Sequence, residues 1–127
     1  HANLLREMSD GVSAFMTDMQ NLGHADRIAG MTFSEFGRRV AENGSIGTDH
    51  GNATLAFAVG HPSRVNGRRI FHGPSGWHGL TDLRDGRDLK HSTDYRSLIS
   101  EVVARHLGNP STEIFPGFAP VPVGFMA

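Results

Sequence analysis

The 127-residue sequence contains no cysteine, which excludes disulfide bonds, thiolate metal sites and a cysteine nucleophile. It also has no excess of either charge, because 12 Lys+Arg against 13 Asp+Glu give a formal net charge of -1. This balance disfavours a strongly basic nucleic-acid binder and an acidic tail protein, and we expect no nucleic-acid partner.

Long apolar runs are absent as well. No run approaches the roughly 20 residues that cross a bilayer, and no signal peptide is visible, so we expect no membrane partner. The content of 38% hydrophobic and 20% charged residues is typical of a folded chain, and the length allows one domain over residues 1–127. Because the chain begins at His1 and enters a helical pattern directly, we expect it to be part of a longer protein.

The first half of the chain predicts one helix and two strands. Apolar residues recur at helical spacing over residues 2–22, which predicts an amphipathic helix whose methionines fill a core. Residues 27–33 predict a strand, and the almost wholly apolar residues 53–59 predict a second strand inside a covered sheet. Because no helical pattern separates the strands, we expect them to be antiparallel. A covered sheet requires flanking helices, which indicates an α/β or α+β layer architecture.

The second half is rich in loops until its last helix. Residues 70–71 predict a short strand, and the alternating charges of residues 82–88 predict a surface segment. We expect the helix to be capped by Ser92 or Thr93, with Asp94 in its first turn and an apolar face that runs from Tyr95 to His106. We expect residues 114–127 to form an extended segment on a surface.

One pair of segments carries the residue types of a metal site. Residues 34–37 (Ser-Glu-Phe-Gly) follow the first predicted strand, and residues 47–51 (Gly-Thr-Asp-His-Gly) precede the second. In an antiparallel pair, Glu35 and His50 lie at the same end of the sheet. A carboxylate and an imidazole beside a glycine-rich backbone suit Zn, Mn, Fe or Mg. The alternative is structural: Asp49 caps a turn, and His50 hydrogen-bonds the backbone.

Residues 32–40 and 43–51 together resemble the signature of an uncharacterised bacterial sulfatase-like family, the domain of unknown function 1501, in the alkaline-phosphatase and sulfatase superfamily. Residues 1–22 and three later segments (82–83, 93–96 and 115–118) resemble its other motifs. The resemblance implies an α/β fold, the C-terminal portion of an alkaline-phosphatase-like three-layer sandwich with a few-stranded sheet and flanking helices. It also implies that the longer protein is exported or periplasmic.

The same segments are similar to those that bind a two-metal centre in phosphopentomutases and cofactor-independent phosphoglycerate mutases. By this resemblance, Glu35 matches a metal-binding Asp and His50 matches the last metal-binding His. Phe36 stands where those enzymes have a His, so one metal site loses an imidazole. Asp49 would orient a loop or support the ligands. Arg38 or Arg39 could clamp an oxyanion, and the alternative is an ion pair with Glu42 or a solvated side chain.

The resemblance implies a metal-dependent hydrolase of small phosphate or sulfate esters, with Zn, Mn, Mg or Ca as its divalent metal. The Ser or Thr nucleophile of that superfamily lies near the start of the longer fold, so we expect this chain alone to be inactive. The alternative is a non-catalytic binding or structural module that retains the scaffold. An open sheet edge would invite pairing with a second copy, so we expect a homo-oligomer.

Four further side-chain groups have two interpretations each. His72, His78 and His91 could reach the same site, or they could simply be exposed on loops. Trp77 could line a substrate pocket or plug the core. His106 fits a buried or helix-terminal structural role better than ligation. Asp94 and Arg96 match a family motif, but helix capping alone explains the acid.

Overall fold

The computed structural model describes residues 2–109 and 114–127. The elements follow in the order α1 (Ala2–Asn21), the 3₁₀ turn η1 (Ala25–Arg27), β1 (Ala29–Met31), β2 (Gly37–Arg38), β3 (His50–Gly51), β4 (Ala58–Gly60), β5 (Leu83–Arg84), β6 (Asp88–Leu89) and α2 (Tyr95–Arg105). The prediction of an α/β chain with few-stranded sheets and flanking helices is confirmed. In these two ranges, no helix has the length and apolar character that a membrane crossing requires.

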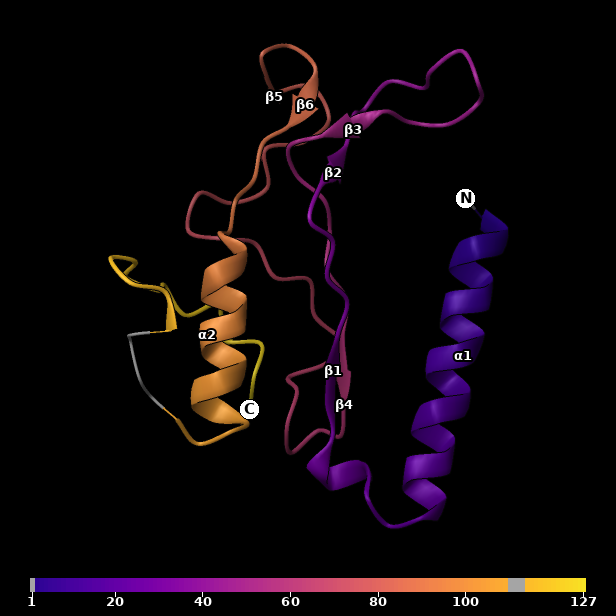
Figure 1. Ribbon diagram of the computed structural model, residues 1–127, viewed down its shortest axis with the longest axis vertical. Coiled ribbons are helices and arrows are strands. Elements are labelled where there is room, and N and C mark those ends of the chain that lie inside the picture. The colour runs from indigo at the N-terminus through magenta and orange to yellow at the C-terminus, as the bar shows by residue number, and fades with distance from the viewer. Residues whose placement is uncertain (1, 110–113) are drawn as a thin grey trace.

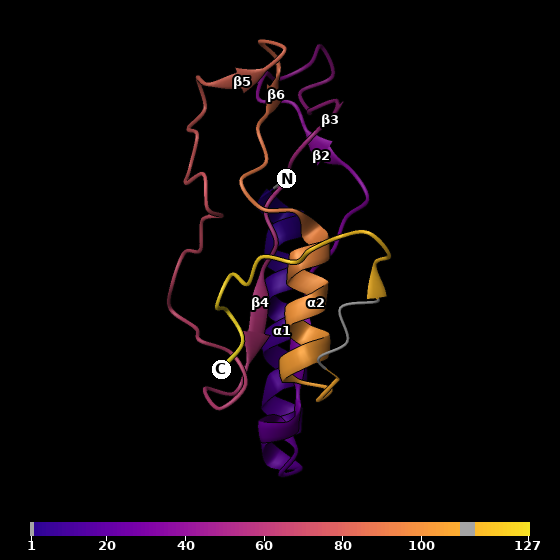
Figure 2. The ribbon, with the colours of Figure 1, turned by 90° about the vertical axis from the view of Figure 1, so that its left-hand side faces the viewer.

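The strands form three antiparallel pairs, β1–β4, β2–β3 and β5–β6. The β1–β4 pair lies between α1 and α2, and the other two pairs lie together at one end of the molecule (Figures 1 and 2). An isolated bridge between Arg39 and Asp88 connects β2 to β6. This end of the molecule therefore gathers the segments that carry the candidate site residues.

The β1–β4 pair confirms the antiparallel prediction but is shorter than predicted. Residues 27–33 contribute only β1, and residues 53–59 contribute only the start of β4. Pairing ends where the Thr32 hydroxyl accepts a hydrogen bond from the Phe57 amide at 2.8 Å, and the Thr32 amide donates to the Phe57 carbonyl at 2.9 Å. Leu55 is 66% exposed, so the prediction of a fully covered second strand was wrong.

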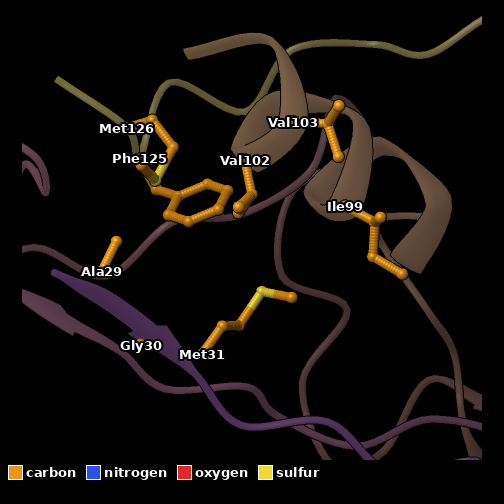
Figure 3. Close-up of a pocket in the computed structure, with 8 residues that line it drawn as sticks. All are labelled: Ala29, Gly30, Met31, Ile99, Val102, Val103, Phe125 and Met126. Atoms are coloured by element: carbon orange, nitrogen blue, oxygen red, sulfur yellow. The ribbon is translucent and has the colours of Figure 1, made fainter. Parts of the chain in front are cut away.

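The C-terminal segment supplies most of the core. Val65, Phe125 and Met126 are the buried hydrophobic residues within the described ranges, and Val65 pairs with Met126 through an isolated bridge. Phe125 lies beside Val102, a residue of α2, at a cavity of about 190 Å³ (Figure 3). The lining of this cavity is apolar and includes residues of β1. The prediction that residues 114–127 lie on a surface was therefore wrong for Phe125 and Met126.

The two buried residues of α2 are polar. Ser97 and Glu101, one turn apart, are buried, and the Ser97 hydroxyl accepts a hydrogen bond from a backbone amide of the C-terminal segment. The Glu101 carboxylate accepts three more backbone hydrogen bonds, from Val123 at 2.7 Å, Gly124 at 2.9 Å and Met126 at 2.8 Å. These bonds give acceptors to four backbone amides of the C-terminal segment, of which the Met126 amide is buried.

Tyr95 of the predicted apolar face is exposed, but Leu98 and Val102 pack against the hydrophobic core. Ile99 and Val103 line the cavity beside the core.

The capping residue at the N-terminus of α2 differs from the prediction. Asp94, and not Ser92 or Thr93, is the N-cap: its carboxylate accepts the Arg96 amide at 2.9 Å and the Arg96 Nη2 at 2.8 Å. The hydrogen bond from the Arg96 side chain is the main reason that the pKa of Asp94 is lowered from 3.8. The side chains of Asp94 and Arg96 therefore bind each other at the start of α2.

Replacing Asp94 with asparagine is expected to lower the free energy of unfolding by up to about 1 kcal/mol at neutral pH, because the cap loses its charge. A lowered folded-state pKa adds stability above the unfolded pKa, and this contribution disappears as the pH falls through the folded value. The wild-type and D94N urea curves should therefore converge below pH 3.8. A difference that persists unchanged in acid would contradict this assignment.

Three other predicted segments also need correction. Helix α1 matches residues 2–22 closely but fills no core, because it packs mainly against η1 and leaves its larger apolar side chains exposed. Residues 70–71 form no strand, and Ile70 is 84% exposed. Residues 82–88 form the β5–β6 hairpin, whose turn places Asp85 (φ 53°) and Gly86 (φ 64°) in left-handed conformations. Most of this segment is exposed as predicted, and the exceptions are the buried Asp88 and the half-buried Leu83.

Candidate functional site

Two glycines allow the two candidate segments to meet. Gly37 of β2 lies opposite Gly51 of β3, and Arg38 lies opposite His50. A Cβ atom on Gly37 would stand 2.0 Å from the carbonyl oxygen of Ala53, and one on Gly51 would stand 2.6 Å from the carbonyl carbon of Arg38. No side chain fits at either position, so the glycine that ends each segment is required by this close approach.

The imidazole of His50 is held by an aromatic stack. Its ring centre lies 3.8 Å from that of Phe36, with an angle of 23° between the rings. The guanidinium carbon of Arg38 lies 5.4 Å from the centre of the same Phe36 ring. Within the described part of the chain, neither nitrogen of His50 makes a hydrogen bond, and the residue is exposed. Phe36 therefore orients a free imidazole.

Glu35 precedes the residue that stacks on His50. It is exposed, and its carboxylate has no hydrogen-bond or ion-pair partner among the described residues. Glu35 lies two residues before β2 and His50 is the first residue of β3, and these two strands pair at one end of the molecule (Figure 1). The described ranges contain no group of three or more His, Asp or Glu side chains that could hold a metal ion. Glu35 and His50 are therefore two unpaired side chains on neighbouring segments, and their role as metal ligands stays a prediction.

Asp49 is bound within its own loop. Its carboxylate accepts hydrogen bonds from Asn43 Nδ2 at 2.9 Å and from Arg39 Nη1 at 3.3 Å. The Asn43 side chain in turn accepts the amides of Ser45 and Gly47 at 3.0 and 3.1 Å. This network holds the turn that leads into His50, and it leaves Asp49 as a residue that shapes the loop.

The two arginines after the first segment have different roles. Arg38 donates to the Thr48 carbonyl at 2.8 Å while its guanidinium lies near the Phe36 ring. Arg39 contacts Asp49 at 3.3 Å, and its Nε lies 3.9 Å from the buried Asp88. The expected alternative of an ion pair with Glu42 is therefore wrong for Arg39. Arg38 is exposed and stands on the same aromatic ring as His50.

The other candidate histidines and the tryptophan separate into two groups. His78 and His91 line one cavity together with Asn52, Arg84 and Lys90, so they are more than exposed loop residues. Trp77 is 57% exposed and does not plug the core. His72 is exposed, and His106 is the C-cap residue of α2, in a helix-terminal position.

Motif residues that are far apart in the sequence meet through aromatic contacts. Phe33 lies 5.6 Å from Tyr95 in an edge-to-face arrangement, and Tyr95 lies 6.4 Å from Phe115. Phe118 continues this series, with the Arg96 guanidinium 4.0 Å from its ring centre. These contacts connect the segment before β2 to the start of α2 and to the C-terminal segment.

Comparison with known protein families finds one family that matches this chain. The family described as "Protein of unknown function (DUF1501)" matches residues 1–112, which is most of the chain. The chain therefore belongs to this family. No curated protein and no solved structure matches it significantly.

Proposed function

We propose that this chain contributes Glu35 and His50 as ligands of a divalent metal in a hydrolase of phosphate or sulfate esters, within an alkaline-phosphatase-like fold. The observation that supports the proposal most is the β2–β3 pairing, in which the unbonded imidazole of His50 stacks on Phe36, the residue that follows the unpaired carboxylate of Glu35. Oxygen and imidazole nitrogen donors suit Zn, Mn or Mg, and Ca would favour the carboxylate.

The residues around the ligand pair have supporting roles in this proposal. A bound cation would act as a Lewis acid on the ester oxygens. Asp49 keeps the loop before His50 in place through Asn43 and Arg39. Arg38, whose guanidinium shares the Phe36 ring with His50, would contact a phosphate or sulfate oxygen. The nucleophile and the remaining ligands would come from outside this chain, whose longer form we propose to be exported.

A non-catalytic binding or structural module is the second candidate. It is favoured by Phe36, which fills one face of the His50 ring with an aromatic stack and cannot ligate a metal. The lack of a third His, Asp or Glu ligand within the described ranges favours it as well. Metal binding separates the two candidates, because a purely structural pair needs no metal.

The metal content of the purified chain after dialysis against Zn or Mn tests the proposal. We expect metal at close to one ion per chain in the wild type and its loss in His50→Ala and in Glu35→Gln, since each variant removes one of two ligands. His24→Ala is the control, because His24 is exposed and its side chain makes no cap hydrogen bond. Equal metal content in all four proteins, or none in any, would favour the structural module.

We also propose that the chain self-associates. Each strand of the β1–β4 pair has an unpaired edge within the described residues, and α1 exposes Leu4, Leu5 and Phe15. Open edges and apolar faces of this kind are typical places for pairing with another chain. Light scattering over a range of concentrations should give a mass above that of the monomer, and a constant monomer mass would contradict the proposal.

A further inference from the structure

A second group of polar side chains lies beside the candidate metal ligands. Asn52, His78, Arg84, Lys90 and His91 line a cavity of about 410 Å³. They come from the residue after β3, from the β5–β6 hairpin and from the adjoining loops. None of the five lining side chains is acidic, and two carry a permanent positive charge.

Asn52 organises one side of this cavity. Its Oδ1 accepts a hydrogen bond from Arg84 Nη1 at 2.7 Å, and its Nδ2 donates to the Leu89 carbonyl at 3.2 Å. The same Nδ2 lies 3.3 Å from Nδ1 of His91. If that ring nitrogen accepts, the neutral His91 carries its proton on Nε2, where it is a donor. Asn52 thus fixes a guanidinium and an imidazole relative to each other.

Asp82 organises the other side from outside the lining. Lys90 Nζ donates to its Oδ1, and Nδ1 of His78 lies 3.4 Å from its Oδ2. The hydrogen bond from Lys90 is the main reason that the pKa of Asp82 is lowered, so this carboxylate stays ionised at neutral pH. A second acid, Asp85, lies 3.7 Å from Arg84 Nε. The two acids hold the two cations in place and equal them in formal charge, so what the cavity offers an anion is N–H groups rather than an excess of positive charge.

Several N–H groups remain for a ligand. Lys90 uses one of its three ammonium protons on Asp82, and the Nη2 of Arg84 has no hydrogen-bond acceptor among the described residues. Guanidinium and ammonium groups bind oxyanions with charge-assisted hydrogen bonds, and the guanidinium can bind two oxygens at once. A cavity of about 410 Å³ exceeds the space that one tetrahedral anion fills and falls within the range of small-molecule sites.

We propose that this cavity binds the phosphate or sulfate group of a small molecule. The tetrahedral oxyanion would accept hydrogen bonds from Arg84 and Lys90, with Nε2 of His91 as a further donor. The remaining space would hold the organic part of the ester. This inference rests on the proposed function only for the ester, because binding of the anion itself requires no metal.

Titration of the full chain with inorganic phosphate and, separately, inorganic sulfate tests the proposal. Calorimetry in chloride buffer with EDTA removes any contribution of a metal. We expect saturable binding of at least one anion, weakened about tenfold in Arg84→Gln and in Lys90→Gln, since each loses a charge-assisted hydrogen bond. Arg6→Gln, the same charge change on the exposed face of α1, should leave the affinity unchanged.

The outcomes separate this inference from the metal proposal. Binding of phosphate alone or of sulfate alone identifies the ester class. Either of these results supports the site, as does binding of both anions. No saturable binding of either anion, or equal weakening in Arg6→Gln, would overturn it. His50→Ala should bind the anion as the wild type does in EDTA, so a failed metal experiment leaves this site standing. Circular dichroism of both pocket variants confirms that they are folded.

Discussion

Replacing Glu101 with alanine is expected to release the C-terminal segment from α2 and to lower the free energy of unfolding by about 3 kcal/mol or more. The carboxylate is 7% exposed and accepts three backbone N–H groups, from Val123, Gly124 and Met126. Alanine leaves three donors without an acceptor, each of which costs about 1–3 kcal/mol when it remains buried. Partial solvation of the freed segment holds the total near the lower end of that sum.

The loss of stability in Glu101→Ala would extend to the hydrophobic core. Phe125 and Met126 are two of its three buried hydrophobic residues, and both lie in the segment that Glu101 holds. Because single domains are stable by only about 5–15 kcal/mol, the variant should lose a large share of its stability. Urea unfolding followed by circular dichroism measures the change, and amide hydrogen exchange locates it. Glu7→Ala on exposed α1 is the control, and an equal effect of both changes would contradict this account.

Replacing Gly37 with alanine is expected to separate β2 from β3 and to abolish metal binding at Glu35 and His50. The new Cβ would stand 2.0 Å from the Ala53 carbonyl oxygen and 2.3 Å from its carbon, distances that the backbone cannot absorb without moving. Overpacking of this kind typically costs about 1–3 kcal/mol. The distortion is concentrated at the β2–β3 pair, next to the candidate ligands in the sequence, so metal binding should suffer more than global stability.

Gly44→Ala is the matched control for this change. It lies in the loop between the same two strands, and a Cβ there would meet no atom within 4 Å. Metal content and urea unfolding should be unchanged in Gly44→Ala and reduced in Gly37→Ala. If the two variants behave alike, the close approach of β2 and β3 does not position the ligand pair.

The elements that local spacing encodes were predictable. Helical periodicity located α1 and α2 to within a few residues, and the absence of a helical pattern between β1 and β4 indicated that they are antiparallel. These signals lie within short stretches of sequence. The burial of each face was not predictable in the same way, because it depends on what packs there. Helix α2 buries Ser97 and Glu101 because a segment more than 20 residues further on needs acceptors for its amides.

The candidate site was predictable in its residues and less so in its geometry. The residue types around Glu35 and His50 indicated a ligand pair, and their role as metal ligands stays a prediction. The stack of His50 on Phe36 and the need for glycine at position 37 depend on the β2–β3 register. That register is set by contacts between segments that a linear pattern does not contain.

The cavity lined by Arg84 and Lys90 was missed for a similar reason. Its residues span positions 52 to 91, and no local pattern connects them. One signal was available: Asp85 and Gly86 form the pair that favours a tight hairpin turn. That turn brings β5 and β6 together and places the two basic side chains on the same cavity.

The most direct test of the metal proposal is a Zn titration of the full chain that observes the imidazole resonances of its eight histidines by NMR. We predict that His50 shifts first, below one equivalent of Zn, and that Glu35→Gln weakens this response. A first response at His78 and His91 would place the metal in the second cavity instead. That result, or no response at any histidine, would contradict the proposal that Glu35 and His50 ligate a metal.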